Sequence, residues 1–180
     1  PIILVAPGLV VVSVIPLGEA SYLGRLNIGI LFILGVTSFK TIAVFMAGFA
    51  SANKYAMLGA VGGVAMLVSY EVPMALSIVG VLLLSGSLSM FDIVAMQDVP
   101  YALVQPLAFL IFIAAASAEM SRTPFDQIEA ESELGSGYNT EYSGMKFGLL
   151  FLGEFMAPII TGMIVTTVFL GGFRGFDPIP

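Results

Sequence analysis

Long apolar runs, separated by short polar connections, set the pattern of this chain. A helix needs about 20 apolar residues to cross a bilayer, whereas a strand of a membrane barrel alternates over about ten, so the runs predict transmembrane helices. The predicted spans are 2–16, Leu26–Phe49, about Met57–Leu88, Tyr101–Ala118 and Lys146–Leu170. The pattern therefore predicts an all-α, polytopic transmembrane bundle of about five spans, with residues 1–180 forming a single membrane domain.

The connections between these runs carry most of the charge. They are residues 50–56, Phe91–Val99, the acidic segment 119–145 and the tail Gly171–Pro180, all of which we predict to be loops. Alternation of the spans places three cations on one side (Lys54, Arg122 and Lys146) and two on the other (Arg25 and Arg174). The excess of positive charge on cytoplasmic loops then assigns the acidic segment to the cytoplasm.

Composition narrows the class of protein. The chain is 58% hydrophobic and 10% charged, with a mean hydropathy of +1.04, whereas a soluble domain carries about 25% charged residues. A net charge of −6 with six scattered cations does not describe a nucleic-acid-binding protein. The sequence has no Cys and no His, so we expect no Fe–S cluster, haem, flavin or metal on this chain. Because it begins at Pro1 inside an apolar run, we interpret it as a fragment of a longer subunit.

Four charged residues interrupt the spans or their ends. Glu71 lies near the middle of the third span and Lys40 within the second, and a charge at that depth costs several kcal/mol unless it is paired, neutralised or hydrated. Pro73 cannot bond the backbone of the preceding turn, so the helix should kink or open beside Glu71. Two interpretations are compatible: an ion pair between Lys40 and Glu71, and a titrating carboxylate in a hydrated path. With Glu119, at the cytoplasmic end of the fourth span, and Glu154, in the fifth, Glu71 forms a candidate chain of carboxylates.

The acidic segment concentrates four carboxylates within eight residues, namely Asp126, Glu129, Glu131 and Glu133. Thr123 and Pro124 are predicted to start a short helix, in which Glu129 and Glu133 are four residues apart and repel each other. The simpler interpretation is a solvated acidic turn. Phe125 and the other apolar residues of the segment argue instead for burial against protein.

Two runs of the acidic segment closely resemble the signature of the quinone-site membrane subunit of respiratory complex I. The first starts at Pro124 and reads Pro-Phe-Asp-Gln-Ile-Glu-Ala-Glu-Ser-Glu-Leu. The second reads Gly137-Tyr-Asn-Thr-Glu-Tyr142-Ser-Gly. Ala47-Gly-Phe-Ala-Ser-Ala-Asn-Lys-Tyr55 and Ser69-Tyr-Glu-Val-Pro73 agree with this family as well. The resemblance covers essentially the whole chain, and it corresponds to the middle of that family.

The resemblance implies a non-redox subunit of a proton-translocating NADH:quinone oxidoreductase in the bacterial plasma membrane or the mitochondrial inner membrane. Its implied partners are the hydrophilic redox arm, antiporter-like membrane subunits, membrane lipid and a quinone bound jointly with other subunits. No activity is expected from this chain alone. By position, Glu71, Glu119 and Glu154 would belong to a proton path. The quinone chamber would be bordered by Arg122, Phe125, Asp126, Glu129, Glu131 and Glu133.

Three positions depart from the family pattern. The family usually carries an Arg three residues after Gly59 and a Gln four residues further on, where this chain has Gly62 and Met66. Lys40 replaces a small or apolar residue, and it is a candidate substitute for the missing positive charge. The second interpretation is the homologous membrane anchor of a membrane-bound hydrogenase or formate hydrogenlyase, which reduces protons instead of quinone.

Overall fold

A computed structural model describes residues 1–18, 21, 23–121, 125 and 141–174. These residues form helices and connecting turns, and no strand occurs among them. The elements are α1 (Ile2–Val14), η1 (Leu23–Arg25), α2 (Gly29–Thr37), α3 (Phe39–Ala50), α4 (Lys54–Ser85), α5 (Met90–Ala95), α6 (Tyr101–Val104), α7 (Pro106–Glu119), α9 (Gly144–Phe169) and η3 (Gly172–Arg174). The predicted all-α membrane bundle is confirmed.

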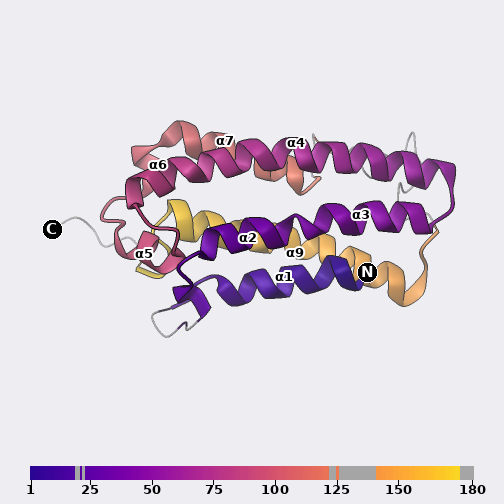
Figure 1. The fold of residues 1–180 in the computed structure, drawn as a ribbon, viewed down its shortest axis with the longest axis horizontal. Coiled ribbons are helices and arrows are strands. Elements are labelled where there is room, and N and C mark those ends of the chain that lie inside the picture. Colours follow the sequence, from indigo (N-terminus) through magenta and orange to yellow (C-terminus); the bar gives the residue numbers. More distant parts are fainter. Residues whose placement is uncertain (19–20, 22, 122–124, 126–140, 175–180) are drawn as a thin grey trace.

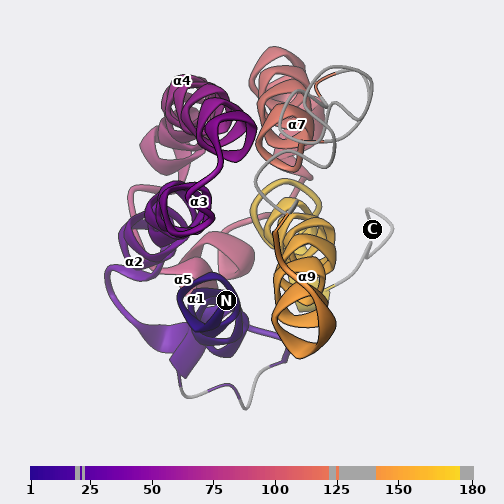
Figure 2. The same cartoon turned by 90° about the vertical axis from the view of Figure 1, so that its right-hand side faces the viewer.

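The helices lie roughly parallel to one long axis (Figure 1). Viewed along that axis, they form a ring in the order α1, α2 with α3, α4, α7 and α9 (Figure 2). Helix α4 packs against α3 and α7, and α1 packs against α9, α2 and α3. Phe169 of α9 closes the ring against α7, since its ring centroid lies 5.4 Å from that of Phe109 and 5.3 Å from that of Phe112.

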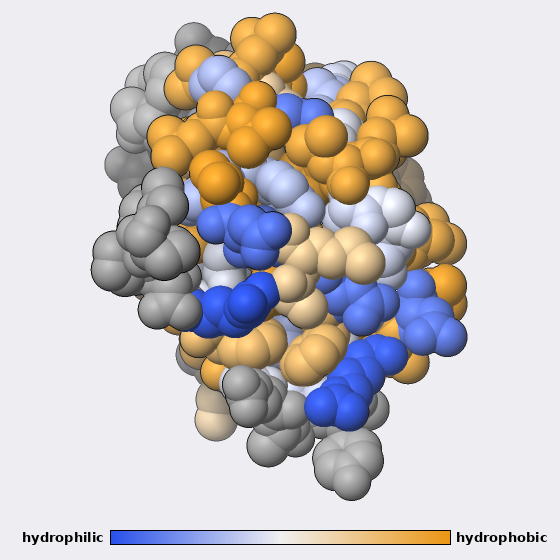
Figure 3. Space-filling model, turned by 90° about the vertical axis from the view of Figure 1, so that its left-hand side faces the viewer, coloured by the Kyte–Doolittle hydropathy of each residue, from blue (hydrophilic) through white to orange (hydrophobic). Residues whose placement is uncertain are grey.

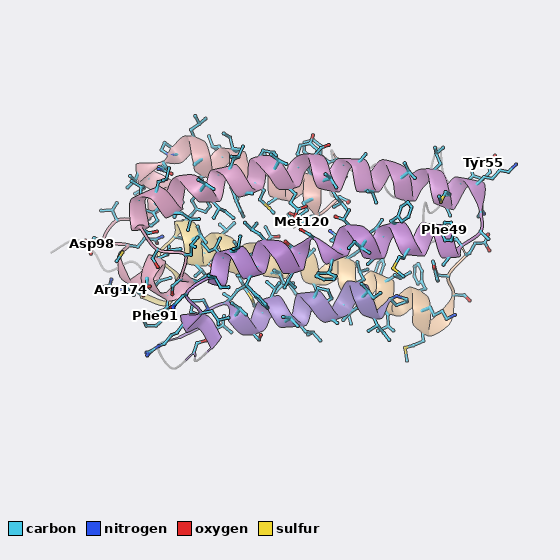
Figure 4. All side chains as sticks on the ribbon, in the orientation of Figure 1. Phe49, Tyr55, Phe91, Asp98, Met120 and Arg174 are labelled. Carbon is cyan, nitrogen blue, oxygen red and sulfur yellow. The ribbon has the colours of Figure 1, made fainter. Side chains whose placement is uncertain are left out.

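Three helical segments within the described ranges are long and apolar enough to cross a membrane, Gly29–Ala50, Lys54–Ser85 and Gly144–Phe169. Helices α1 and α7 are apolar but shorter. Large apolar side chains such as Phe39, Phe49 and Leu83 point outward, as expected for a surface that faces lipid or other membrane helices. The two ends of the bundle are labelled in Figure 4: Phe49 and Tyr55 lie at one end, and Phe91, Asp98 and Arg174 at the other.

The connection between α3 and α4 is a tight turn that ends in a side-chain cap for α4. Ala52 has a φ of 49°, and the Asn53 side chain then caps α4 by accepting a hydrogen bond of 3.0 Å from the Tyr55 amide. Helix α4 ends where Gly86 adopts a left-handed conformation, with φ of 65°. Pro73 does not interrupt α4, which runs as one helix from Lys54 to Ser85.

Two predicted boundaries are wrong. The loop predicted at Phe91–Val99 contains helix α5, because Ile93 and Val94 are both 0% exposed and their burial holds the segment in a helical turn. The span predicted at Tyr101–Ala118 is divided into α6 and α7. Gln105 precedes Pro106, and a residue before proline is driven out of the helical region; its φ and ψ are −129° and 67°.

The end of the bundle near Arg174 is polar. Hydrophilic side chains gather on this face among hydrophobic neighbours (Figure 3), and Arg25, Asp92, Asp98 and Arg174 are all exposed. The Arg25 guanidinium lies 4.8 Å from the centroid of the Phe91 ring. The helices α4 and α9, with Lys54 and Lys146 in their first turns, begin at the opposite end (Figure 1). The separation of these cations into two groups is therefore as predicted; Arg122 lies outside the described residues.

Candidate functional site

The four charged residues predicted within the spans come from four different helices. Lys40 belongs to α3, Glu71 to α4, Glu119 to α7 and Glu154 to α9. Each side chain is half-buried. Helices α3, α4, α7 and α9 are neighbours around the bundle (Figure 2). Lys40 interacts with Glu119 and Glu154, and Glu119 interacts with Glu71, so the four charges are neighbours although they lie far apart in the sequence.

Lys40 donates a hydrogen bond of 2.8 Å from Nζ to the backbone carbonyl of Glu119. That carbonyl belongs to the last turn of α7, where the backbone acceptors have no partner within the helix and the helix dipole attracts a cation. The ammonium group also interacts electrostatically with the carboxylates of Glu119 and Glu154. One cation is therefore shared between two acidic side chains and a helix end.

Glu71 has a different partner from the one that the sequence suggested. Its Oε1 accepts a hydrogen bond from the hydroxyl of Ser38, which lies between α2 and α3. The Glu71 carboxylate also interacts electrostatically with that of Glu119. The Lys40–Glu71 ion pair, one of the two interpretations of the sequence, is thus not formed; Ser38 bonds Glu71 and Lys40 bonds Glu119.

Glu119 lies deeper in the bundle than the sequence suggested. Helix α7 has only 14 residues and begins at Pro106; at 1.5 Å per residue, it is about 21 Å long, shorter than the hydrocarbon core of about 30 Å. Met120, the residue after Glu119, lies near the middle of the long axis (Figure 4). Glu119 therefore lies away from both ends of the bundle, where it lines a cavity together with Lys40.

A cavity of about 70 Å³ adjoins this cluster. Lys40 and Glu119 supply its charged wall, Thr37 and Thr161 supply hydroxyl groups, and the remaining wall is apolar, from α1, α4, α7 and α9. A second, mostly apolar cavity of about 20 Å³ shares Thr37 and Phe112 with it as lining residues. The first cavity, which has polar groups in its wall, is large enough to hold water next to Glu119 and Lys40.

Two prolines add backbone acceptors next to the acids. Pro73 has no N–H for the carbonyl of Ser69, and Pro158 has none for the carbonyl of Glu154. Both helices continue through their proline. Polar backbone atoms therefore accompany Glu71 and Glu154 at depths where apolar helices otherwise present none.

The described residues of the acidic segment contact the α3–α4 hairpin at Phe125, Glu141 and Tyr142. The Phe125 ring lies 5.4 Å, centroid to centroid, from the ring of Tyr70, the neighbour of Glu71. Tyr142 donates a hydrogen bond of 2.9 Å to the carbonyl of Ala47, and Asn53 donates one of 2.9 Å to Glu141. The predicted loop residues Arg122, Asp126, Glu129, Glu131 and Glu133, and the predicted start of the short helix at Thr123 and Pro124, lie outside the described residues.

Sequence reasoning missed Ser38, Glu141 and Tyr142 as members of this arrangement. A serine within an apolar run gives no signal, because such residues commonly bond their own helix. Glu141 and Tyr142 belong to the motif that carries the family resemblance, but a motif does not give the partners of its residues. Within the described residues, no group of three or more His, Cys, Asp or Glu side chains is placed to hold a metal ion.

The fold and this cluster define a class: a polytopic helical membrane protein in which three acidic side chains and one lysine interact within the bundle, next to a cavity lined by Lys40 and Glu119. Residues 1–179 match the NADH dehydrogenase family, and the chain belongs to that family.

Among curated relatives, the chain is 51% identical over 175 residues to the H subunit of NADH-quinone oxidoreductase from Dehalococcoides mccartyi strain CBDB1, a match that covers 97% of the chain and 50% of the relative. It is 46% identical to the H subunit numbered 2 of NADH-quinone oxidoreductase from Geobacter sulfurreducens, over 97% of the chain and 56% of the relative. It is 43% identical to the H subunit of the same enzyme from Bacillus thuringiensis strain Al Hakam, over 99% of the chain and 55% of the relative. The chain spans about half the length of the curated relatives that it matches.

Proposed function

We propose that this chain is part of the membrane subunit of a proton-translocating NADH:quinone oxidoreductase, and that Glu71, Glu119, Glu154 and Lys40 belong to the path that couples quinone reduction to proton translocation. The observation that carries the proposal is a chain of neighbouring charges inside an apolar bundle: the Lys40 ammonium group interacts with the carboxylates of Glu119 and Glu154, and Glu119 interacts with Glu71. Ionised groups in such a place are costly unless they are balanced. A change in the charge of one group therefore changes the proton affinity of its neighbours.

The acidic segment is proposed to border the quinone chamber. Phe125 contacts Tyr70, and Tyr70 precedes Glu71 in α4, so a contact leads from this segment to the carboxylate cluster. The names of the relatives refer to a quinone enzyme, which favours this interpretation over a hydrogenase anchor. The proposed chamber residues are Arg122, Phe125, Asp126, Glu129, Glu131 and Glu133.

In this proposal the chain carries no redox centre of its own, and quinone binds jointly with other subunits. The partners are the hydrophilic redox arm, antiporter-like membrane subunits and lipid of the inner or plasma membrane. The isolated chain would have no quinone reductase activity.

The test replaces Glu71 by Gln in the full-length subunit within the assembled complex. Gln keeps the size of the side chain and can accept the Ser38 hydrogen bond, but it cannot exchange a proton. We expect fewer protons to be translocated per quinone reduced, with normal assembly. Asp98→Asn is the matched control, because it removes an exposed carboxylate at the end of the bundle that carries Phe91 and Arg174, outside the charged cluster. Normal translocation per turnover in an assembled Glu71→Gln complex would refute the proposal.

A further inference from the structure

At the junction between α2 and α3, the backbone carbonyl of Leu34 has more hydrogen-bond donors around it than helix α2 alone would supply. The carbonyl of Leu34 accepts from the Ser38 amide at 3.3 Å, as in an ordinary helix. It also accepts from the Thr37 hydroxyl at 3.0 Å and from the Ser38 hydroxyl at 3.1 Å. Three donors thus share one carbonyl, so the carbonyl remains bonded when one of them turns away.

The Ser38 hydroxyl has a second acceptor, the Oε1 of Glu71 in α4. A hydroxyl has only one proton to donate, so it can serve the Leu34 carbonyl or the Glu71 carboxylate but not both fully. An ionised carboxylate is the stronger acceptor. The hydroxyl therefore turns to Glu71 while that group is ionised.

Protonation of Glu71 reverses the preference. The neutral carboxyl group can donate its own proton to the Ser38 oxygen, and the hydroxyl proton of Ser38 is then free to return to the Leu34 carbonyl. No covalent bond to the Ser38 oxygen is made or broken; its hydroxyl only rotates. Both protonation states of Glu71 keep a hydrogen bond to the same residue.

We propose that Ser38 is a positioning residue for Glu71, which holds the carboxyl group in its interaction with Glu119 through both protonation states by rotating its hydroxyl between Glu71 and Leu34. This inference rests on the proposed role of Glu71 in proton transfer. The other titratable groups near the pair are Tyr70, the residue before Glu71, and Glu119, whose carboxylate interacts with that of Glu71 and whose carbonyl binds Lys40. Ser38 therefore connects the backbone junction of one helix to the proton-carrying side chain of the next.

The test uses the full-length subunit in its assembled complex, with two readouts. The first is the infrared difference band of the Glu71 carboxyl group, assigned by its loss in Glu71→Gln. The second is the rate of proton-coupled quinone reduction. Ser38→Ala should move the band to higher frequency, because the carboxyl group loses a hydrogen bond. It should also lower the rate about tenfold, the factor expected for one charge-assisted hydrogen bond.

Three further variants separate positioning from structure. Ser38→Thr retains the hydroxyl and should restore the band and the rate. Ser38→Cys keeps the volume but donates weakly, so it should shift the band in the same direction by less, even if Ser38→Ala does not assemble. Ser69→Ala is the control: its hydroxyl bonds the Ala65 carbonyl at 2.6 Å on the exposed side of α4, and neither readout should change.

The outcomes separate this inference from the proposed function. An unchanged Glu71 band in Ser38→Ala or Ser38→Cys, or an equal shift in Ser69→Ala, would overturn the positioning role even if Glu71→Gln stops proton translocation. If the Glu71 band is shifted in Ser38→Ala or Ser38→Cys but Glu71→Gln translocates protons normally, the hydrogen bond is supported and the proton path is refuted. A shifted band in Ser38→Thr would show that the hydroxyl is not what positions Glu71.

Discussion

Replacing Lys40 by Met tests how the buried charges are balanced. Met has a similar length and an apolar end, so the change removes the ammonium group with little loss of volume. In the structure this removes a 2.8 Å hydrogen bond to the Glu119 carbonyl. It also removes the positive charge that interacts with the carboxylates of Glu119 and Glu154.

The expected cost follows from these contacts. A hydrogen bond from a charged donor contributes about 1.5–3 kcal/mol, and removing one partner of a buried ion pair costs about 3–5 kcal/mol. The Lys40 side chain as a whole is half-buried, although its ammonium group lies against Glu119 inside the bundle. Partial solvation reduces the second figure. We expect Lys40→Met to lower the free energy of unfolding by about 2–3 kcal/mol.

The assay is reversible unfolding of the full-length subunit in detergent micelles, with double-mutant cycles that identify the partner of Lys40. Glu119→Gln combined with Lys40→Met should recover part of the loss, because both charges are removed together, with a coupling of about 1–2 kcal/mol. Glu71→Gln combined with Lys40→Met should be nearly additive, since Glu71 is bonded to Ser38. Lys54→Met, at an exposed position at the start of α4, is the control and should change stability by less than about 0.5 kcal/mol.

Two results would refute this reasoning. A strong coupling of Lys40 with Glu71, and none with Glu119, would restore the ion pair inferred from sequence and contradict the geometry. A Lys40→Met variant as stable as the control would show that the ammonium group does not balance the carboxylates at all.

Other predictions concern packing, the acidic segment and the isolated chain. Gly48→Ala would place a Cβ atom in steric overlap with Cβ of Ala60, so α3 and α4 must separate. We expect the free energy of unfolding in micelles to fall by about 1–3 kcal/mol. Gly62→Ala is the control, because its Cβ meets no neighbour within 4 Å, and it should show no comparable loss. Replacing Glu129 and Glu133 together by Gln should lower quinone reductase activity while electron transfer to an artificial acceptor is retained; if neither activity changes, these acids form a solvated turn. The purified 180-residue chain should bind quinone far more weakly than the intact complex, and stoichiometric binding at the affinity of the complex would contradict this.

The class of fold and the membrane setting can be predicted from local properties of the chain. Span prediction depends on the apolar character of consecutive residues. The spans predicted at about Met57–Leu88 and at Lys146–Leu170 agree to within a few residues with α4 (Lys54–Ser85) and α9 (Gly144–Phe169). Turn signals are also local, as at Asn53 and Gly86. The burial cost of Glu71 and Lys40 is evident from the sequence for the same reason, since it depends only on their depth in an apolar run.

Which charges meet is set by helix packing, and no local pattern predicts it. Ser38 and Glu71 are 33 residues apart in the sequence, and Lys40 and Glu119 are 79 apart. The rotation of each helix about its own axis decides which of its side chains meet a neighbouring helix. A helix that is apolar on almost every face carries little sequence information about that rotation. Helix α7 is short because the residue before Pro106 leaves the helical conformation, which brings Glu119 to the middle of the bundle. Glu119 and Glu154, which look independent along the chain, therefore share the Lys40 cation only once the helices have packed.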